Sequence, residues 1–206
     1  MQSQTIDNYD HGQPVEWLWS TPLYIGSINN STQLNDLLLD SVGNYKSLPK
    51  VDHRFDGALL EHDFFHNPSG SRAKLLEIIH ESIVKINTSF PLAESNKFDV
   101  AGWFLACEEG GTVPPHSHPN SIWSGVYYLK TSESKSRRSG KLELIDPRGG
   151  VDYFVAPGRP FSRSLFISPK AGMLVIFPSW LRHYVHPNSG SDVRISIPFN
   201  ATNAKI

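Results

Sequence analysis

Two histidines separated by a single residue, His116 and His118, are the residues of this sequence best placed for chemistry. They lie in a stretch, residues 110–128, whose composition favours extended backbone, and side chains two apart leave a strand on the same face. A third histidine, His183, follows a strand-like run and a turn that begins at a proline. Imidazole nitrogens are common transition-metal ligands, so three histidines from two distant strands could bind one ion.

The same stretch also predicts one wall of a pocket beside these histidines. Counting by twos from His116 places a further series of side chains on the inward face, if the extended conformation persists. Trp123 and Tyr127 fall on the opposite face. The inward series is His118, Asn120, Ile122, Ser124, Val126 and Tyr128.

A second set of polar side chains follows His183 on the last strand-like run. Counting by twos gives Arg194, Ser196 and Pro198 on one face of that run. A guanidinium group offers a fixed pair of donors that matches a carboxylate. An arginine at this position therefore suits a dicarboxylate cosubstrate whose far end lies away from the metal.

Short β-rich runs and two amphipathic helices must position these groups. The first helix is predicted between an N-cap at residues 30–32 and Gly43, and the second follows Ser69 with a wide apolar stripe from Leu75 to Ile86. Turn residues separate the predicted strands. These strands span residues 98–107, 121–130, 141–145, 151–155, 164–167, 173–177 and 193–199. The pattern predicts an α+β, mainly β fold with a β-sandwich or jelly-roll core.

The chain is expected to form a single domain over residues 1–206. Within it, residues 1–97 are expected to provide a polar N-terminal arm, the two helices and a rim loop, and residues 98–200 the β core. The rim loop contains His62 and His66, whose spacing of four could bind zinc on a helix. The segment ends directly afterwards at Asn67 and Pro68, so we expect these two histidines to be surface or packing residues.

Composition excludes several classes of function. The formal net charge of -1 gives no global field for a polyanion, so neither nucleic acid nor an anionic membrane is an expected partner. Cys107 is the only cysteine, which excludes an intrachain disulfide framework, and we expect it to pack as a small hydrophobe. The polar N-terminus lacks the features of a signal peptide, and no apolar run reaches membrane-spanning length. These features predict a soluble, cytoplasmic protein.

Four stretches resemble the iron(II)- and 2-oxoglutarate-dependent oxygenases, in particular a small prolyl-hydroxylase-like branch. Residues 116–128 match a His-x-His-Pro-x-Ser-x-x-Ser-Gly-x-x-Tyr motif, and residues 146–148 read Asp-Pro-Arg. Residues 180–183 read Trp-Leu-Arg-His, and residues 194–200 read Arg-Ile-Ser-Ile-Pro-Phe-Asn. Their order and spacing agree with that branch over about residues 98–200, which makes the resemblance far more specific than a lone His-x-His.

The resemblance implies a double-stranded β-helix, flanked here by the two helices, and O₂-dependent hydroxylation of a small molecule or a peptidyl residue. It implies a mononuclear Fe(II) site at His116, His118 and His183, with no catalytic residue beyond the metal centre. It also implies 2-oxoglutarate as cosubstrate, gripped by Arg194 and Ser196. Ser124 and Tyr128 are the further residues that we expect around 2-oxoglutarate. A homodimer is compatible with this interpretation.

One position departs from the superfamily pattern. Most members bind iron with two histidines and one carboxylate, and the second position of the motif is then Asp or Glu. Here it is His118, so either three histidines bind iron or a carboxylate such as Asp146, or a water, takes one place. All-neutral ligands would leave the site one negative charge short.

Two other functions remain open on sequence grounds. A cupin-like metal dioxygenase or isomerase also has Gly110 followed by His116 and His118, but its motif expects a glutamate where this chain has Ile122 and Trp123. A non-catalytic jelly-roll binding protein is the third alternative.

Around the site, His186 is expected to be exposed in a turn, and Arg148 and Arg182 could contact substrate or solvent.

Overall fold

The fold comes from a computed structural model, which describes residues 20–50, 58–134, 136–149 and 164–204. Two α-helices, one short 3-10 helix and eleven strands occur in these residues. The helices are α1 (Ser31–Val42), η1 (Tyr45–Ser47) and α2 (Gly70–Ser89). The strands are β1 (Tyr24–Ser27), β2 (Ala58–Glu61), β3 (Phe98–Gly102), β4 (Phe104–Cys107), β5 (Val113–His116), β6 (Trp123–Lys130), β7 (Leu142–Ile145), β8 (Ser164–Ile167), β9 (Met173–Pro178), β10 (His183–Val185) and β11 (Arg194–Asn203).

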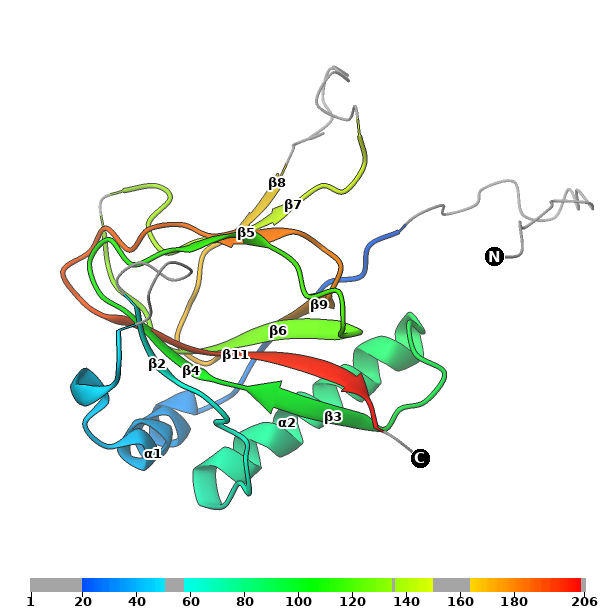
Figure 1. Cartoon of the computed structure of the whole chain (residues 1–206), viewed down its shortest axis with the longest axis horizontal. Helices are drawn as coiled ribbons and strands as arrows, with labels where there is room; N and C mark the ends of the chain where they lie inside the picture. The colour runs from blue at the N-terminus through cyan, green and yellow to red at the C-terminus, as the bar shows by residue number, and fades with distance from the viewer. Residues whose placement is uncertain (1–19, 51–57, 135, 150–163, 205–206) are drawn as a thin grey trace, which may run out of the picture.

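The strands form two antiparallel sheets that face each other, with the helices on the outer side of the larger one (Figure 1). The larger sheet has the order β1-β9-β6-β11-β4-β2, and β3 also pairs with β11. The smaller sheet has the order β5-β10-β7-β8. Two facing sheets whose strands alternate along the chain are the arrangement of a jelly roll, so the predicted α+β, mainly β fold is confirmed.

The larger sheet separates two cores. Its outer face packs on α1 and α2 through residues such as Trp123, Tyr127 and Ile197. Its inner face packs on the smaller sheet through residues such as Val126 and Phe177. Because β6 is buried on both faces, its sequence reads as a nearly continuous apolar run rather than as an alternating one.

The prediction that successive side chains of β6 point to opposite faces is confirmed where the strand is regular. Val126 and Tyr128 face the smaller sheet, whereas Trp123 and Tyr127 face the helices. The pairing of β6 with β11 shifts register beside Leu129, which is the extra residue of a β-bulge. The amide Nδ2 of Asn35 in α1 donates a hydrogen bond of 3.0 Å to the Leu129 carbonyl, so the helix satisfies an acceptor at the bulge.

Three sequence predictions need correction. The extended conformation does not persist from His116 to Tyr128, because a turn interrupts it between β5 and β6. As a result Asn120 is exposed and Ile122 packs on the helix side, so the inward positions predicted for both were wrong. The strand predicted at residues 98–107 is two strands that meet at Trp103.

Some predictions remain outside what the structure addresses. The strand predicted at 151–155 and the arm at 1–15 lie outside the described residues. The division of the chain at residue 97 stays a prediction.

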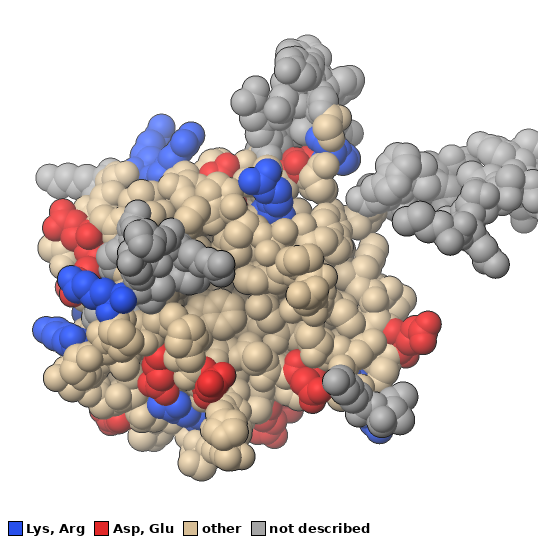
Figure 2. Space-filling view, viewed as in Figure 1, with Lys and Arg blue, Asp and Glu red and all other residues tan. Residues whose placement is uncertain are grey.

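Neither α1 nor α2 is long and apolar enough to cross a membrane, and the same holds for any other helix in the described ranges. On the face drawn in Figure 2, acidic and basic side chains are interspersed rather than gathered by sign.

Candidate metal centre and cosubstrate pocket

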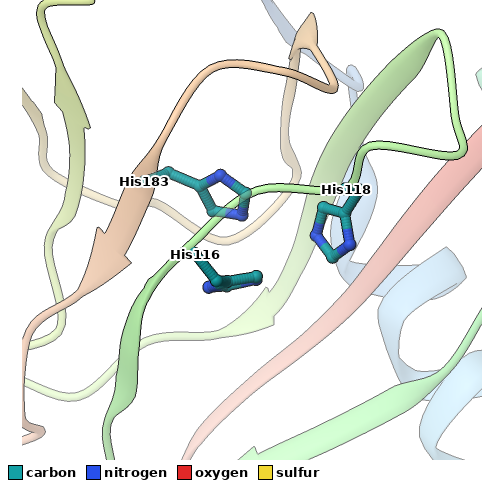
Figure 3. A group of neighbouring side chains, drawn as sticks. All are labelled: His116, His118 and His183. Carbon is teal, nitrogen blue, oxygen red and sulfur yellow. The ribbon is translucent and has the colours of Figure 1, made fainter.

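Three histidines meet at one end of the space between the two sheets. His116 ends β5, His118 follows it in the connecting loop, and His183 begins β10 (Figure 3). His183 lies directly opposite His116 in the β5–β10 pairing. One nitrogen from each ring lies within 4.8 Å of the other two. Within the described part of the chain, these three residues form the one group of His, Cys, Asp or Glu side chains arranged to hold a metal ion.

Backbone carbonyl groups fix the rings of two of these histidines. His116 Nδ1 lies 2.8 Å from the carbonyl oxygen of Pro114, and His183 Nδ1 lies 2.9 Å from that of Leu181. A carbonyl oxygen only accepts, so in each ring Nδ1 carries the proton and Nε2 keeps its lone pair. A metal-binding histidine is commonly oriented by such a second hydrogen bond. Both rings are therefore held with Nε2 free to bind a metal.

Burial keeps the histidines neutral. Removal from water lowers the pKa of His183 to about 3, and the neighbouring His116 adds to this effect. Burial also lowers the pKa of His118 to about 4, again with a contribution from His116, and it lowers the pKa of His116 itself. Neutral imidazole is the form that binds a metal. The site therefore needs no deprotonation near neutral pH before a metal binds.

These shifts predict that the metal-free protein loses stability in mild acid. A histidine in the unfolded chain has a pKa near 6.5 and takes up a proton below that pH. His183 in the folded chain stays unprotonated down to about pH 3. The free energy of unfolding should fall as pH drops below about 6.5, by roughly 1 kcal/mol per pH unit for His183. Urea titrations of chelator-treated protein at several pH values measure this slope. His183→Gln should flatten it, exposed His62→Gln should not, and an unchanged slope in both variants contradicts the prediction.

At the far end of the same pocket lies a buried guanidinium group. Arg194 is 2% exposed, and its Nη1 donates to the hydroxyl of fully buried Ser196 at 3.3 Å. Its Nε has no hydrogen-bond partner, and no acidic side chain in the described ranges pairs with it. A buried cation without a counter-ion is costly, so Arg194 fits a site built for an anionic ligand.

Tyr128 lies beside Arg194. The guanidinium carbon is 5.0 Å from the centre of the Tyr128 ring, and the phenol is fully buried, with no partner for its oxygen in the part of the chain that the structure describes. Burial raises the pKa of this phenol, and the adjacent guanidinium opposes the shift. Tyr128 therefore stays a neutral hydrogen-bond donor, and it lines the same pocket as Arg194.

Ser124 also lines the pocket, but at the histidine end. It pairs with Asn200 across β6 and β11, and its hydroxyl donates a hydrogen bond of 2.7 Å to Asn200 Oδ1. Asn200 Nδ2 in turn lies 3.2 Å from His118 Nδ1. Asn200 was not singled out from the sequence. Continuing the count by twos beyond Pro198 would have placed it on the pocket face.

The residues present fit Fe(II) and 2-oxoglutarate. Imidazole nitrogens suit Fe(II), among other transition metals, and the cationic end of the pocket suits a carboxylate. Walls between the two ends are largely apolar; they include Leu105, Val113, Val126, Leu142, Phe177 and Val185. Asp146 is held by Arg148 through bonds of 2.6 and 2.9 Å, and it is not part of the histidine group. The structure thus favours three histidines over a ligand set that includes Asp146.

His186 corrects a sequence prediction. It was expected to be exposed, but it is only 7% exposed and its Nε2 lies 2.7 Å from Glu143 Oε2. A carboxylate on the neighbouring strand β7 therefore allows the imidazole to be buried outside the metal site.

Other residues considered from the sequence lie apart from the centre or at its edge. His62, His66 and Arg182 are exposed, and Cys107 is fully buried as expected. Trp103 lines the pocket, with its ring centre 6.2 Å from that of His118, whereas Trp180 is 46% exposed.

Solved structures show where this fold has been seen before. A Pseudomonas putida prolyl-4-hydroxylase is 17% identical, with a TM-score of 0.61 over 90% of this chain and 95% of the other. HygX from Streptomyces hygroscopicus, solved with nickel, 2-oxoglutarate and hygromycin B, is 12% identical, with a TM-score of 0.61 over 89% and 84%. A Trichoplax adhaerens prolyl hydroxylase, solved with a hypoxia-inducible-factor peptide, is 14% identical, with a TM-score of 0.58 over 88% and 83%. At these identities the likeness shows the fold, the double-stranded β-helix expected from the sequence.

A family model carries the comparison beyond fold. Residues 101–200 match the family described as "Putative 2OG-Fe(II) oxygenase". Over these residues the chain is similar to the 2OG-Fe(II) oxygenases. The whole candidate site, from Trp103 to Asn200, lies within the matched residues. No curated protein sequence matches the chain significantly.

The family match agrees with the expected cofactors, namely Fe(II), 2-oxoglutarate and O₂. It also favours the oxygenase over the cupin and the non-catalytic binding protein.

Proposed function

We propose that the chain is a hydroxylase that inserts oxygen into an unactivated C–H bond of a small molecule or a peptidyl residue. The single observation that carries this proposal is Arg194, a buried guanidinium without a counter-ion in the described residues, in the same pocket as three converging histidines. A pocket that offers a metal site at one end and a carboxylate site at the other fits a 2-oxo dicarboxylate.

In this proposal each side chain has a defined task. His116, His118 and His183 would hold Fe(II) through imidazole nitrogens. Arg194 and Ser196 bind the far carboxylate of 2-oxoglutarate, and the Tyr128 hydroxyl donates a further hydrogen bond. When bound, iron and 2-oxoglutarate together reduce O₂: one oxygen atom enters succinate as CO₂ leaves, and the other becomes the product hydroxyl. The apolar walls keep water from the reacting atoms.

Both kinds of substrate have precedents among proteins of the same fold. HygX was solved with hygromycin B, and the Trichoplax adhaerens enzyme with a peptide fragment. At the histidine end of this chain the side chains near the pocket are aromatic or neutral, with Trp103 beside His118. We infer that the reacting part of the substrate is an uncharged carbon framework, which packs against these rings.

Anaerobic titration of the Fe(II)-loaded protein with 2-oxoglutarate tests the proposal. Chelation of iron by the 2-oxo acid should produce a visible charge-transfer band, and admission of O₂ should then convert 2-oxoglutarate into succinate and CO₂. With ¹⁸O₂ and a panel of peptides and small metabolites, one labelled atom should appear in succinate and one in a hydroxylated product. A protein that binds Fe(II) but shows no band and forms no succinate contradicts the proposal.

A further inference from the structure

His118 is oriented differently from its two neighbours. The rings of His116 and His183 each meet a backbone carbonyl oxygen, which can only accept a hydrogen bond. His118 Nδ1 meets instead the side-chain carboxamide of Asn200, at 3.2 Å. A carboxamide has a donor end and an acceptor end of nearly the same shape. Its orientation therefore decides which nitrogen of His118 carries the proton.

The two orientations have opposite consequences for a metal ion. With Nδ2 of Asn200 toward the ring, as the structure shows, His118 Nδ1 accepts a hydrogen bond and the proton sits on Nε2. That tautomer has no lone pair to offer from Nε2. After a half-turn of the amide, Oδ1 accepts a proton from Nδ1, and the Nε2 lone pair becomes free for a metal.

Ser124 can form a hydrogen bond with Asn200 in either orientation of the amide. Its hydroxyl donates to Asn200 Oδ1 at 2.7 Å in the present arrangement. A hydroxyl group can also accept, so after the half-turn it can receive a hydrogen bond from Asn200 Nδ2. Ser124 is 2% exposed, so water competes little for this bond. Neither orientation leaves a buried polar group of this pair without a partner.

We propose that Asn200, held by Ser124, is a positioning residue that selects the metal-binding tautomer of His118. It thereby decides whether the ion is bound by three imidazoles or by two. This inference rests on the proposed function, because it assumes that the three histidines bind a metal. It assigns to Ser124 a role at the metal end, in place of the direct 2-oxoglutarate contact expected from the sequence.

Cobalt(II) binding to the full chain, measured against a competing chelator, tests the inference without catalysis. The visible spectrum of bound Co(II) also reports its ligand set. Asn200→Leu, which removes the acceptor, should lower Co(II) affinity about 10- to 100-fold and change the spectrum. Asn200→Asp, which can only accept, should bind at least as tightly as the natural chain. Asn35→Leu is the matched control: Asn35 is a buried, hydrogen-bonded asparagine in α1, and its loss should leave the spectrum unchanged.

A double-mutant cycle separates positioning from general stability. In a His118→Ala background, Asn200→Leu should have no further effect on Co(II) affinity. Equal losses in both backgrounds, or no loss in the natural one, overturn the inference. If Asn200→Leu does not fold, Ser124→Ala takes its place in the same cycle, with an expected loss of several-fold that is likewise absent without His118.

Failure of the proposed function gives a different result. If the natural chain binds no Co(II) or Fe(II), the three-histidine site itself is wrong, and this inference falls with it. If binding is present and depends on His183 but not on Asn200, only the inference fails.

Discussion

Replacing Arg194 with alanine should abolish tight binding of 2-oxoglutarate while the metal still binds. Arg194 is 2% exposed, its Nη1 bonds to Ser196, and its Nε is free of partners in the described chain. Truncating one member of a buried charge pair costs about 2–5 kcal/mol. We therefore expect a loss of affinity of roughly 100-fold or more. Anaerobic titration of the Fe(II) protein measures it through the charge-transfer band.

Three comparisons make this result specific. Arg194→Lys should not restore affinity, because an ammonium group cannot reproduce the two parallel donors of a guanidinium. Exposed Arg137→Ala should bind 2-oxoglutarate normally. A 2-oxo acid without the far carboxylate, 2-oxobutanoate, should bind the natural protein and Arg194→Ala about equally. If Arg194→Ala keeps its preference for 2-oxoglutarate over 2-oxobutanoate, the carboxylate is bound elsewhere.

Loss of the His183 side chain should remove the metal. His183 is 6% exposed and its Nδ1 is fixed by the Leu181 carbonyl group, so no other described side chain can replace it as a ligand without rearrangement of the site. Changing a residue that only supports a ligand costs 10- to 100-fold in metal affinity, so removing a ligand itself should cost roughly 100-fold or more. Competition titrations with Co(II) or Fe(II) give the affinity directly.

His186 provides a matched control for His183. It lies three residues further along, is 7% exposed, and bonds to Glu143 rather than to the metal site. His186→Ala should lower stability, because it leaves Glu143 without a partner for one oxygen, but metal affinity should stay within a few-fold of the natural value. Equal losses of metal affinity in both variants would show that His183 acts through folding rather than as a ligand.

The fold and the two ends of the site could be predicted because they depend on local periodicity. Alternation along a strand placed Arg194 and Ser196 together on the pocket face, and the apolar stripe from Leu75 to Ile86 predicted α2. Each of these predictions needs only neighbours within one element. The motif spacing then connected the histidine end with the arginine end.

The errors lie where a distant partner or a turn decides the outcome. His186 is buried because the carboxylate of Glu143, on another strand, forms a hydrogen bond with it. The sequence around His186 does not predict this pairing. Asn120 and Ile122 do not lie on the predicted pocket face, because a turn after His118 interrupts the extended backbone on which the prediction depended. The count by twos from Arg194 places Asn200 on the pocket face, but it does not show which group an asparagine there contacts. The significance of Asn200 comes from its distance to His118.

The strand β11 pairs with β3, β4 and β6, and it carries Arg194, Ser196 and Asn200 on a single face. Since successive side chains of a strand point to opposite faces, a shift of β11 by one residue against its neighbours would turn all three toward the helices together. In evolution this strand can change by substitution, one position at a time. A one-codon insertion or deletion between Ser196 and Asn200 would instead put the carboxylate-binding residues and the partner of His118 on opposite faces, so the length of β11 should vary less among descendants than its composition.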